Sequence, residues 1–378
     1  MKLIPVFKPL ITSTEINAAK KSLKVGWLGM GKSVNYFEKK IKQITNSKKK
    51  YIVAVNTGHS ALHLSMMLLG IKKGDEVITP SFNNVADIQS ILAVGAKPIF
   101  CDILEDTLCI DPSKIKQLIS KKTKAIIAMD YGASIAEHDE INFIAKKNRL
   151  RVIHDAAHSL GSEYKNKKIG SFSDVTMFSF DPVKTFTCID GGAIIVNTRK
   201  EMLKLHEMRL MGMAQKASVM YKNKRTSTYD VTRLGFRYHL ANLHAAIGIE
   251  QLKKLNVIKK TRRDIFLKYN QSFKFIKGII IPKINKDSIP FHYCIRVKFG
   301  QRIKLVNFLK KKGIDSGIHW RPNHWLSFFK KEKRGNLEVT NRIGKEILSL
   351  PFHSLMNKKD VDRVIHSLKK FFNEQSIS

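Results

Sequence analysis

Short apolar runs alternate with amphipathic segments along the first half of the chain. Four of these runs have the length of buried strands: IVAV at 52–55, EVITP at 76–80, KPIFCDI at 97–103 and KAIIAMDYGA at 124–133. Residues 60–69 and 138–150 instead repeat apolar side chains at intervals of three and four, as helices do. Strands that are apolar on both faces are typical of a parallel sheet covered by helices on each side. The pattern therefore predicts an α/β fold from about residue 50 to Asp155.

The pattern changes after about residue 255. The segment FHYCIRVKF at 291–299 alternates like a half-buried strand, and residues 304–313 and 361–371 have helical spacing. We therefore expect a large domain at 1–255, including an N-terminal arm, and a smaller α+β domain at 256–378. Between the two patterned parts, residues 214–233 are polar and predict a loop, either disordered or a gate over the substrate.

Four side chains with complementary chemistry follow two of the predicted strands. Asp155 comes directly after VIH, and His158 lies three residues further on. Ser179 lies in the run TMFSF, and Lys184 lies in the loop that follows it. The carboxyl ends of strands in open α/β sheets are where ligands bind, so we expect all four groups near one crevice. Pyridoxal 5'-phosphate (PLP) requires an amine, a carboxylate for its ring nitrogen and donors for its phosphate, and these residues supply such groups.

A second stretch has the features of a phosphate site. Asn56 and Thr57 follow the strand IVAV, and Gly58 allows a close backbone turn into the next helix. The amides of His59 and Ser60 then face outward at the helix N-terminus, where anions bind. Many strand-to-helix turns have this form, so the turn alone is a weak signal.

The run HDAAHSLGS, followed by GSFSDVTMFSFDPVK and a Gly-Gly turn, resembles the DegT/DnrJ/EryC1/StrS family of sugar aminotransferases. The resemblance implies that Lys184 holds PLP as a Schiff base and that Asp155 partners the ring nitrogen. It places His158 beside the ring hydroxyl and Ser179 at the phosphate. It also implies a fold-type I enzyme that transfers an amino group from L-glutamate, through pyridoxamine 5'-phosphate (PMP), to a keto group of a nucleotide-linked sugar. Such sugars serve the biosynthesis of surface polysaccharides, including lipopolysaccharide.

The chain departs from the family pattern at the cofactor. The family has Gly-Thr where this chain has Gly58 and His59, so a hydroxyl ligand would come from Ser60 instead. The family usually has an aromatic ring at position 84 to stack on the pyridine, and this chain has Asn84. Either Asn84 gives up that stacking, or Phe82 provides it after a local shift of register.

Other residues are assigned to the site by the resemblance. Asn242 can cap the helix that follows it, but the matching asparagine of the family reaches the cofactor phosphate of the other subunit, which implies a homodimer with shared active sites. The resemblance places five residues near the substrate: Trp27, Arg237, His319, Trp320 and His324. Arg237 stands where the family commonly has Asn, and packing is the more common role for His319, Trp320 and His324.

The cysteines and the apolar runs indicate in which cellular compartment the protein is found. The four cysteines show neither CxxC nor zinc-ligand spacing, so we expect reduced thiols, no metal site and a cytoplasmic protein. We find no signal peptide and no apolar run long enough to cross a bilayer.

The net charge of +37, from 68 Lys+Arg against 31 Asp+Glu, raises the possibility of nucleic-acid binding. The basic residues are spread over the chain, so solvated helix faces explain them better, and we expect no nucleic-acid partner. Two alternatives to an aminotransferase stay open. One is a PLP-dependent nucleotide-sugar dehydratase, in which the family has histidine in place of Lys184, and the other is a non-catalytic relative that binds DNA or another polyanion.

Overall fold

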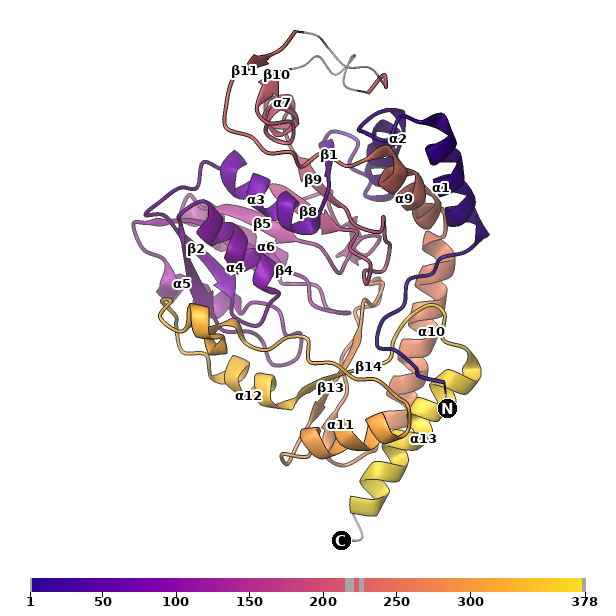
Figure 1. The fold of residues 1–378 in the computed structure, drawn as a ribbon. Coiled ribbons are helices and arrows are strands. Elements are labelled where there is room, and N and C mark those ends of the chain that lie inside the picture. The colour runs from indigo at the N-terminus through magenta and orange to yellow at the C-terminus, as the bar shows by residue number, and fades with distance from the viewer. Residues whose placement is uncertain (1, 215–220, 224–227, 376–378) are drawn as a thin grey trace.

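A seven-stranded sheet organises the first half of the protein (Figure 1). The structure is a computed structural model that describes residues 2–214, 221–223 and 228–375. The strand order is β1-β9-β8-β5-β4-β2-β3, and β9 runs antiparallel to both of its neighbours while the other pairs are parallel. The strands are β1 (Tyr51–Val55), β2 (Glu76–Pro80), β3 (Lys97–Cys101), β4 (Thr123–Met129), β5 (Arg151–Asp155), β8 (Val175–Ser179) and β9 (Gly192–Val196). The expected α/β fold with a mainly parallel sheet is confirmed.

Helices cover both faces of this sheet because its strands are apolar on both sides. Ile126 and Ile127 are consecutive residues of β4, and they pack into different core clusters on opposite faces. The first cluster includes side chains of α5 and α6, and the second includes side chains of α3, α4 and α7. These helices are α3 (Gly58–Leu68), α4 (Val85–Ala93), α5 (Pro112–Leu118), α6 (His138–Lys147) and α7 (Arg199–Met208).

A smaller antiparallel sheet, in the order β12-β13-β14, lies in the C-terminal part of the chain. Its strands are β12 (Ile279–Ile280), β13 (Tyr293–Val297) and β14 (Ile347–Leu350). Four helices belong to this part: α10 (Leu255–Phe273), α11 (Arg302–Lys311), α12 (Glu338–Glu346) and α13 (Lys358–Gln375). Short elements complete the described chain: β6 (Glu163–Tyr164), β7 (Lys167–Lys168), β10 (Met213–Ala214), β11 (Asp230–Val231), η1 (Asn323–Trp325) and η2 (Ser327–Phe329).

The N-terminal segment lies against the C-terminal part, and Figure 1 shows the N-terminus beside α13. The amide of Ile4 donates to Gly313 O at 3.0 Å, and the amide of Asp315 donates back to Ile4 O at 3.0 Å. The amide of Phe352 donates to Val6 O at 2.9 Å. The N-terminal arm thus bonds to residues beyond the predicted boundary at 255, and the boundary itself stays a prediction.

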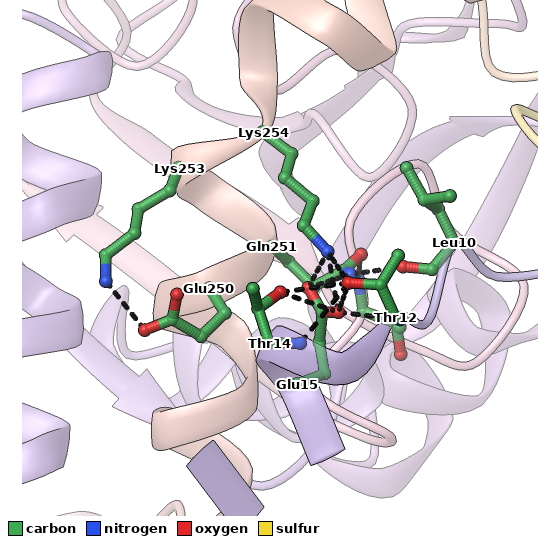
Figure 2. Close-up of polar contacts among 9 residues, drawn as sticks. Leu10, Thr12, Thr14, Glu15, Glu250, Gln251, Lys253 and Lys254 are labelled. Carbon is green, nitrogen blue, oxygen red and sulfur yellow. Dashed lines mark hydrogen bonds and ion pairs between the residues drawn. The ribbon is translucent and has the colours of Figure 1, made fainter. Parts of the chain in front are cut away.

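Helix α1 (Ser13–Val25) is fastened to α9 (Asn242–Lys253) by a buried carboxylate, Glu15 (Figure 2). Glu15 accepts hydrogen bonds from the amide of Thr12 at 2.9 Å, from Lys254 Nζ at 2.6 Å and from Gln251 Nε2 at 2.9 Å. Burial alone would raise the pKa of Glu15, but these bonds outweigh it and lower the pKa to about 2. The carboxylate is therefore charged in the folded protein and ties the N-terminal helix to α9.

The predicted loop at 214–233 lies partly outside the described residues, which omit 215–220 and 224–227. Within the described part, β10 and β11 pair antiparallel at the two ends of this segment. Tyr221 donates from its hydroxyl to Glu38 Oε2 at 2.7 Å, on α2 (Lys32–Ile44). Across the described ranges, every helix is too short or too polar to cross a membrane.

Candidate functional site

A cavity of about 420 Å³ opens at the carboxyl ends of β1, β2, β5 and β8, where the sequence predicts a crevice. Phe291, His319 and Trp320, from the C-terminal part, line it as well. The cavity brings together nine of the residues predicted for the site: Gly58, His59, Asn84, Asp155, His158, Ser179, Lys184, His319 and Trp320. Residues from both parts of the chain therefore form its wall.

Asp155 and Lys184 form the charged centre of the cavity. Asp155 is the last residue of β5, and its Oδ1 accepts the amide of Ala157 at 2.9 Å. Burial raises the pKa of Asp155 to about 6, against the opposing effects of the Ala157 bond and the Lys184 charge. Burial likewise lowers the pKa of Lys184, although Asp155 favours its charged form. The pair combines a carboxylate that is ionised at neutral pH with an amine that gives up its proton more easily than usual.

His158 provides an uncharged ring beside this pair. Its ring stacks on Phe291 with centroids 4.1 Å apart, and Lys184 Nζ lies 4.8 Å from the centre of the same phenyl ring. Burial lowers the pKa of His158 well below its ordinary value, and the Lys184 charge adds to this effect. The amide of Gly132 donates to Nδ1 at 3.3 Å, so the single ring proton belongs on Nε2. His158 can therefore donate from Nε2, as the predicted contact with a ring hydroxyl requires.

The start of α3 and the end of β8 form a narrow cradle. A Cβ atom on Gly58 would lie 2.8 Å from both Cβ and Oγ of Ser179, so only glycine allows this approach. Gly192 serves a similar purpose, since a Cβ there would lie 2.2 Å from Thr57 O. Helix N-termini favour anions because their first amides lack helical partners. This cradle fits the phosphate of PLP.

The Ser60 hydroxyl is not available to this cradle. It donates to Asn56 Oδ1 at 2.7 Å and lies 2.8 Å from Thr57 Oγ1, while the Ser60 amide donates to the same Thr57 oxygen. Ser60 is also absent from the cavity lining. The predicted Ser60 ligand is therefore wrong, because the Thr57 cap of α3 uses this hydroxyl and this amide.

Neither residue considered for ring stacking provides an aromatic face. Asn84 lines the cavity, but its side chain caps α4 by accepting the amide of Ala86 at 2.9 Å. Phe82 is fully buried, 5.3 Å from the ring of Tyr131, and does not line the cavity. The Phe82 alternative is therefore wrong, and the aromatic side chains that line the cavity include Phe7, Phe291 and Trp320.

Besides Ser60, four of the predicted residues lie away from the cavity. His324 is buried between Ser81 Oγ, at 2.7 Å from Nδ1, and Asn341 Oδ1, at 2.9 Å from Nε2. Arg237 is exposed, in a bridge with Leu210. Trp27 and Asn242 line a separate surface cavity of about 590 Å³.

Asn242 does not cap the helix as its side chain suggested. The cap residue of α9 is Ala241, and Asn242 is the first helical residue. The Asn242 amide group instead accepts from the backbone N of Ser33 at 3.2 Å and donates to Trp27 O at 3.2 Å. The predicted cap is therefore wrong, because the side chain joins α9 to the glycine-rich loop before α2.

Several side chains of the cavity were not predicted from the sequence, among them Phe7, Asp87 and Phe291. Phe7 stacks on Phe291 at 5.4 Å between centroids, so the N-terminal segment supports the ring beneath His158. Asp87 lies in the first turn of α4, where acidic residues are common for reasons of helix stability. The sequence therefore did not indicate that Asp87 belongs to the site, although Asp87 follows the predicted residue Asn84 by less than one helical turn.

A buried group of three side chains, the Asp130 cluster, lies behind Asp155. Its members, Asp130, His138 and His154, are the one set of potential metal ligands found in the described ranges. His138 Nε2 and His154 Nε2 lie 3.0 and 2.7 Å from the Asp130 carboxylate, and burial lowers the pKa of His154 to about 4 although Asp130 opposes this. The Asp130 amide donates to Asp155 O at 3.1 Å. The geometry is that of two imidazole N–H groups donating to one carboxylate, which braces the end of β5.

Comparison with known proteins places this arrangement in a family. Residues 9–369 match the model of the DegT/DnrJ/EryC1/StrS aminotransferase family. The chain is 33% identical over 376 residues to the spore coat polysaccharide biosynthesis protein SpsC of Bacillus subtilis, covering 97% of this chain and 96% of that protein.

Solved structures agree with this match. Helicobacter pylori PseC, an aminotransferase involved in the biosynthesis of pseudoaminic acid, is 27% identical, with a TM-score of 0.91 over 99% of this chain and all of that one. The PLP form of Streptococcus pneumoniae Spr1654 is 26% identical, with a TM-score of 0.90 over 98% of this chain and 99% of that one. The chain therefore belongs to the DegT/DnrJ/EryC1/StrS aminotransferase family.

Proposed function

We propose that this protein is a PLP-dependent aminotransferase that moves an amino group from L-glutamate to a keto group of a nucleotide-linked sugar. The observation that carries the proposal is the cavity in which Lys184 and Asp155 lie together beside the Gly58 and Ser179 cradle. An amine, an acid and an anion cradle are the three groups that PLP requires. Family membership and the PLP form of Spr1654 support the same cofactor.

Each residue has a distinct role in this proposal. Bound PLP supplies an electron sink for the carbon that carries the amino group. Lys184 holds the cofactor through Nζ and, once free, moves a proton as base and then acid, for which its lowered pKa is suited. Asp155 accepts a hydrogen bond from the ring nitrogen and keeps it protonated. His158 donates from Nε2, and Ser179 with the start of α3 binds the phosphate.

The substrate class is supported by the relatives. The printed descriptions of PseC and SpsC concern pseudoaminic acid and spore coat polysaccharide, so a role in surface polysaccharide biosynthesis is proposed here as well. The net charge of +37 favours approach of an anionic nucleotide sugar. The free, buried cysteines fit the proposed cytoplasmic location.

Absorption spectroscopy of the Lys184→Ala variant tests the function. The wild-type protein is expected to bind PLP with the visible band of a lysine-bound cofactor, and glutamate should remove that band. Lys184→Ala should lack the band, whereas Lys253→Ala, at an exposed lysine, should keep it. A wild-type protein that shows no such band with PLP would contradict the proposal, and binding of DNA by that protein that persists at about 0.2 M salt would favour the polyanion alternative.

We further propose a homodimer in which each active site contains Asn242 from the partner chain. Asn242 and Trp27 line a cavity separate from that of Lys184, so within one chain they do not meet the cofactor residues. A symmetric pair of chains could bring the two sets together, as the family resemblance implies. This arrangement accounts for a predicted cofactor ligand that lies away from its own cavity.

Mixed dimers test the shared site. Lys184→Ala and Asn242→Ala are each expected to be nearly inactive, but a hybrid of the two has one site with both wild-type residues. Random reassociation should therefore restore about a quarter of wild-type activity, because half of the dimers are hybrids. Mass spectrometry shows whether the hybrids form. If they form and activity is not restored, Lys184 and Asn242 act in the same site of one chain, which would contradict the proposal.

A further inference from the structure

A second carboxyl group, Asp87, faces the same cavity as Asp155 and Lys184. Asp87 lies in the first turn of α4 and is 1% exposed. Its Oδ2 accepts a short hydrogen bond from Asn83 Nδ2. Its Oδ1 is buried and has no hydrogen-bond partner within the described ranges. A buried oxygen without a partner destabilises the fold, so its retention at the edge of a binding cavity calls for a functional explanation.

The charges around Asp87 decide its protonation. Burial raises the pKa of Asp87 well above its ordinary value, and the negative charge of Asp155 raises it further. The bond from Asn83 and the charge of Lys184 act in the opposite direction without reversing the shift. Two carboxyl groups that share a site do not both ionise readily, because their charges repel. Asp155, with a pKa of about 6, keeps the charge and Asp87 keeps the proton.

We propose that Asp87 is a positioning residue for the ring-nitrogen contact, in which its neutral carboxyl donates from Oδ1 toward the Asp155 carboxylate, directly or through one water. Asp155 Oδ1 already accepts the amide of Ala157, so a second donor would fix the plane of the carboxylate that meets the pyridine nitrogen. A neutral donor also leaves a single negative charge at that contact. This inference rests on the proposed PLP chemistry and adds a residue to it.

A purely structural role makes different predictions. Through Asn83, Asp87 belongs to the turn before α4, where Asn323 Nδ2 donates to Asn83 O at 2.8 Å. If Asp87 served that turn alone, its replacement would lower the stability of the apoprotein and leave the affinity for PLP unchanged. A positioning role predicts instead that a replacement without a donor weakens PLP binding and shifts the visible spectrum, in addition to any loss of stability from the broken Asn83 bond.

Asp87→Asn and Asp87→Leu separate these roles when the affinity for PLP and the visible spectrum are measured with the melting temperature of the apoprotein. Asparagine keeps a neutral donor of the same shape, so the affinity should stay within about twofold of wild type. Leucine should weaken PLP binding about tenfold and shift the visible band. It also removes the acceptor of Asn83 Nδ2, so a lower apoprotein melting temperature is expected for either role, and the affinity and the spectrum decide between the roles. Asp87→Ala replaces the leucine variant if that protein does not fold.

Three results would overturn the inference. An asparagine variant that loses as much affinity as the leucine variant would show that the negative charge is what matters. Wild-type affinity and spectrum in the leucine variant, with a lowered melting temperature, would assign Asp87 to the turn alone. Wild-type affinity with an unchanged melting temperature would show that Asp87 has neither role. Each of these results requires a wild-type protein that binds PLP, whereas failure of the wild type to bind PLP is failure of the proposed function itself.

Discussion

Single atoms determine whether the site can form. The cradle for an anion exists because residue 58 lacks a Cβ atom, which would lie 2.8 Å from Ser179. Gly58 is the first residue of α3, so its backbone is helical and alanine would suffer no strain there. The glycine is needed for the close approach of the α3 backbone to the Ser179 side chain and not for the turn of the chain.

Gly58→Ala is accordingly expected to weaken PLP binding about tenfold or more while the protein stays folded, because α3 must move away from Ser179. Equilibrium dialysis of PLP measures the loss. Gly29→Ala is the matched control, since a Cβ there meets nothing within 4 Å. Equal PLP affinities for the two variants would show that the cradle does not hold the cofactor.

At the scale of single residues, the positions of side chains at the ends of strands could be predicted from the sequence. Asp155 and Ser179 end β5 and β8, and parallel strands bring such ends to one edge of the sheet. The sequence could not predict how hydroxyl and amide side chains choose their partners. Ser60 turns to Asn56, and Asn242 turns to Ser33, because those groups are the nearest after folding.

Helices α1 and α9 are joined by a charged group in a buried position. Glu15 has a pKa of about 2 against an ordinary value of 4.5. Because the folded protein holds the proton less tightly than the unfolded chain, Glu15 stabilises the fold above pH 4.5. That contribution is lost as the pH falls from about 4.5 toward 2.

Glu15→Gln should reduce the free energy of unfolding by about 2 kcal/mol at pH 7, because Lys254 loses its charged partner. The difference from wild type should shrink at pH 3, as measured by urea unfolding of the apoprotein. Glu250→Gln, which removes the exposed pair with Lys253 shown in Figure 2, should change stability by less than about 0.5 kcal/mol at either pH. A Glu15→Gln difference that stays constant with pH would contradict the assigned charge.

The elements of the large sheet were predictable because each carries its own apolar pattern. Residues 52–55 and 76–80 follow that pattern and lie in β1 and β2. The position of the N-terminal segment was not predictable, because Ile4 bonds to Gly313 and Asp315 through backbone atoms that carry no sequence pattern. Contacts between distant parts of the chain depend on the complete fold.

The positive net charge comes from basic residues spread over the whole molecule and not from a sequence motif. With a net charge of +37, the protein should bind duplex DNA at about 0.05 M salt and release it near 0.2 M, as nonspecific phosphate contacts do. Fluorescence anisotropy with a labelled duplex measures this dependence. Binding that persists at the higher salt concentration, and that PLP displaces, would indicate a nucleic-acid site in the cavity and contradict the expected absence of such a partner.

The contact of Phe7 with Phe291 has a practical consequence for work with this enzyme. Only two residues separate Phe7 from the backbone bridge at Ile4, and His158 stacks on the same Phe291 ring. A purification tag fused before Met1 is therefore expected to disturb the part of the cavity wall that Phe7 forms. Proteases that trim the first eight residues would remove Phe7 from that wall. Assays of cofactor affinity are therefore best made on protein tagged after α13.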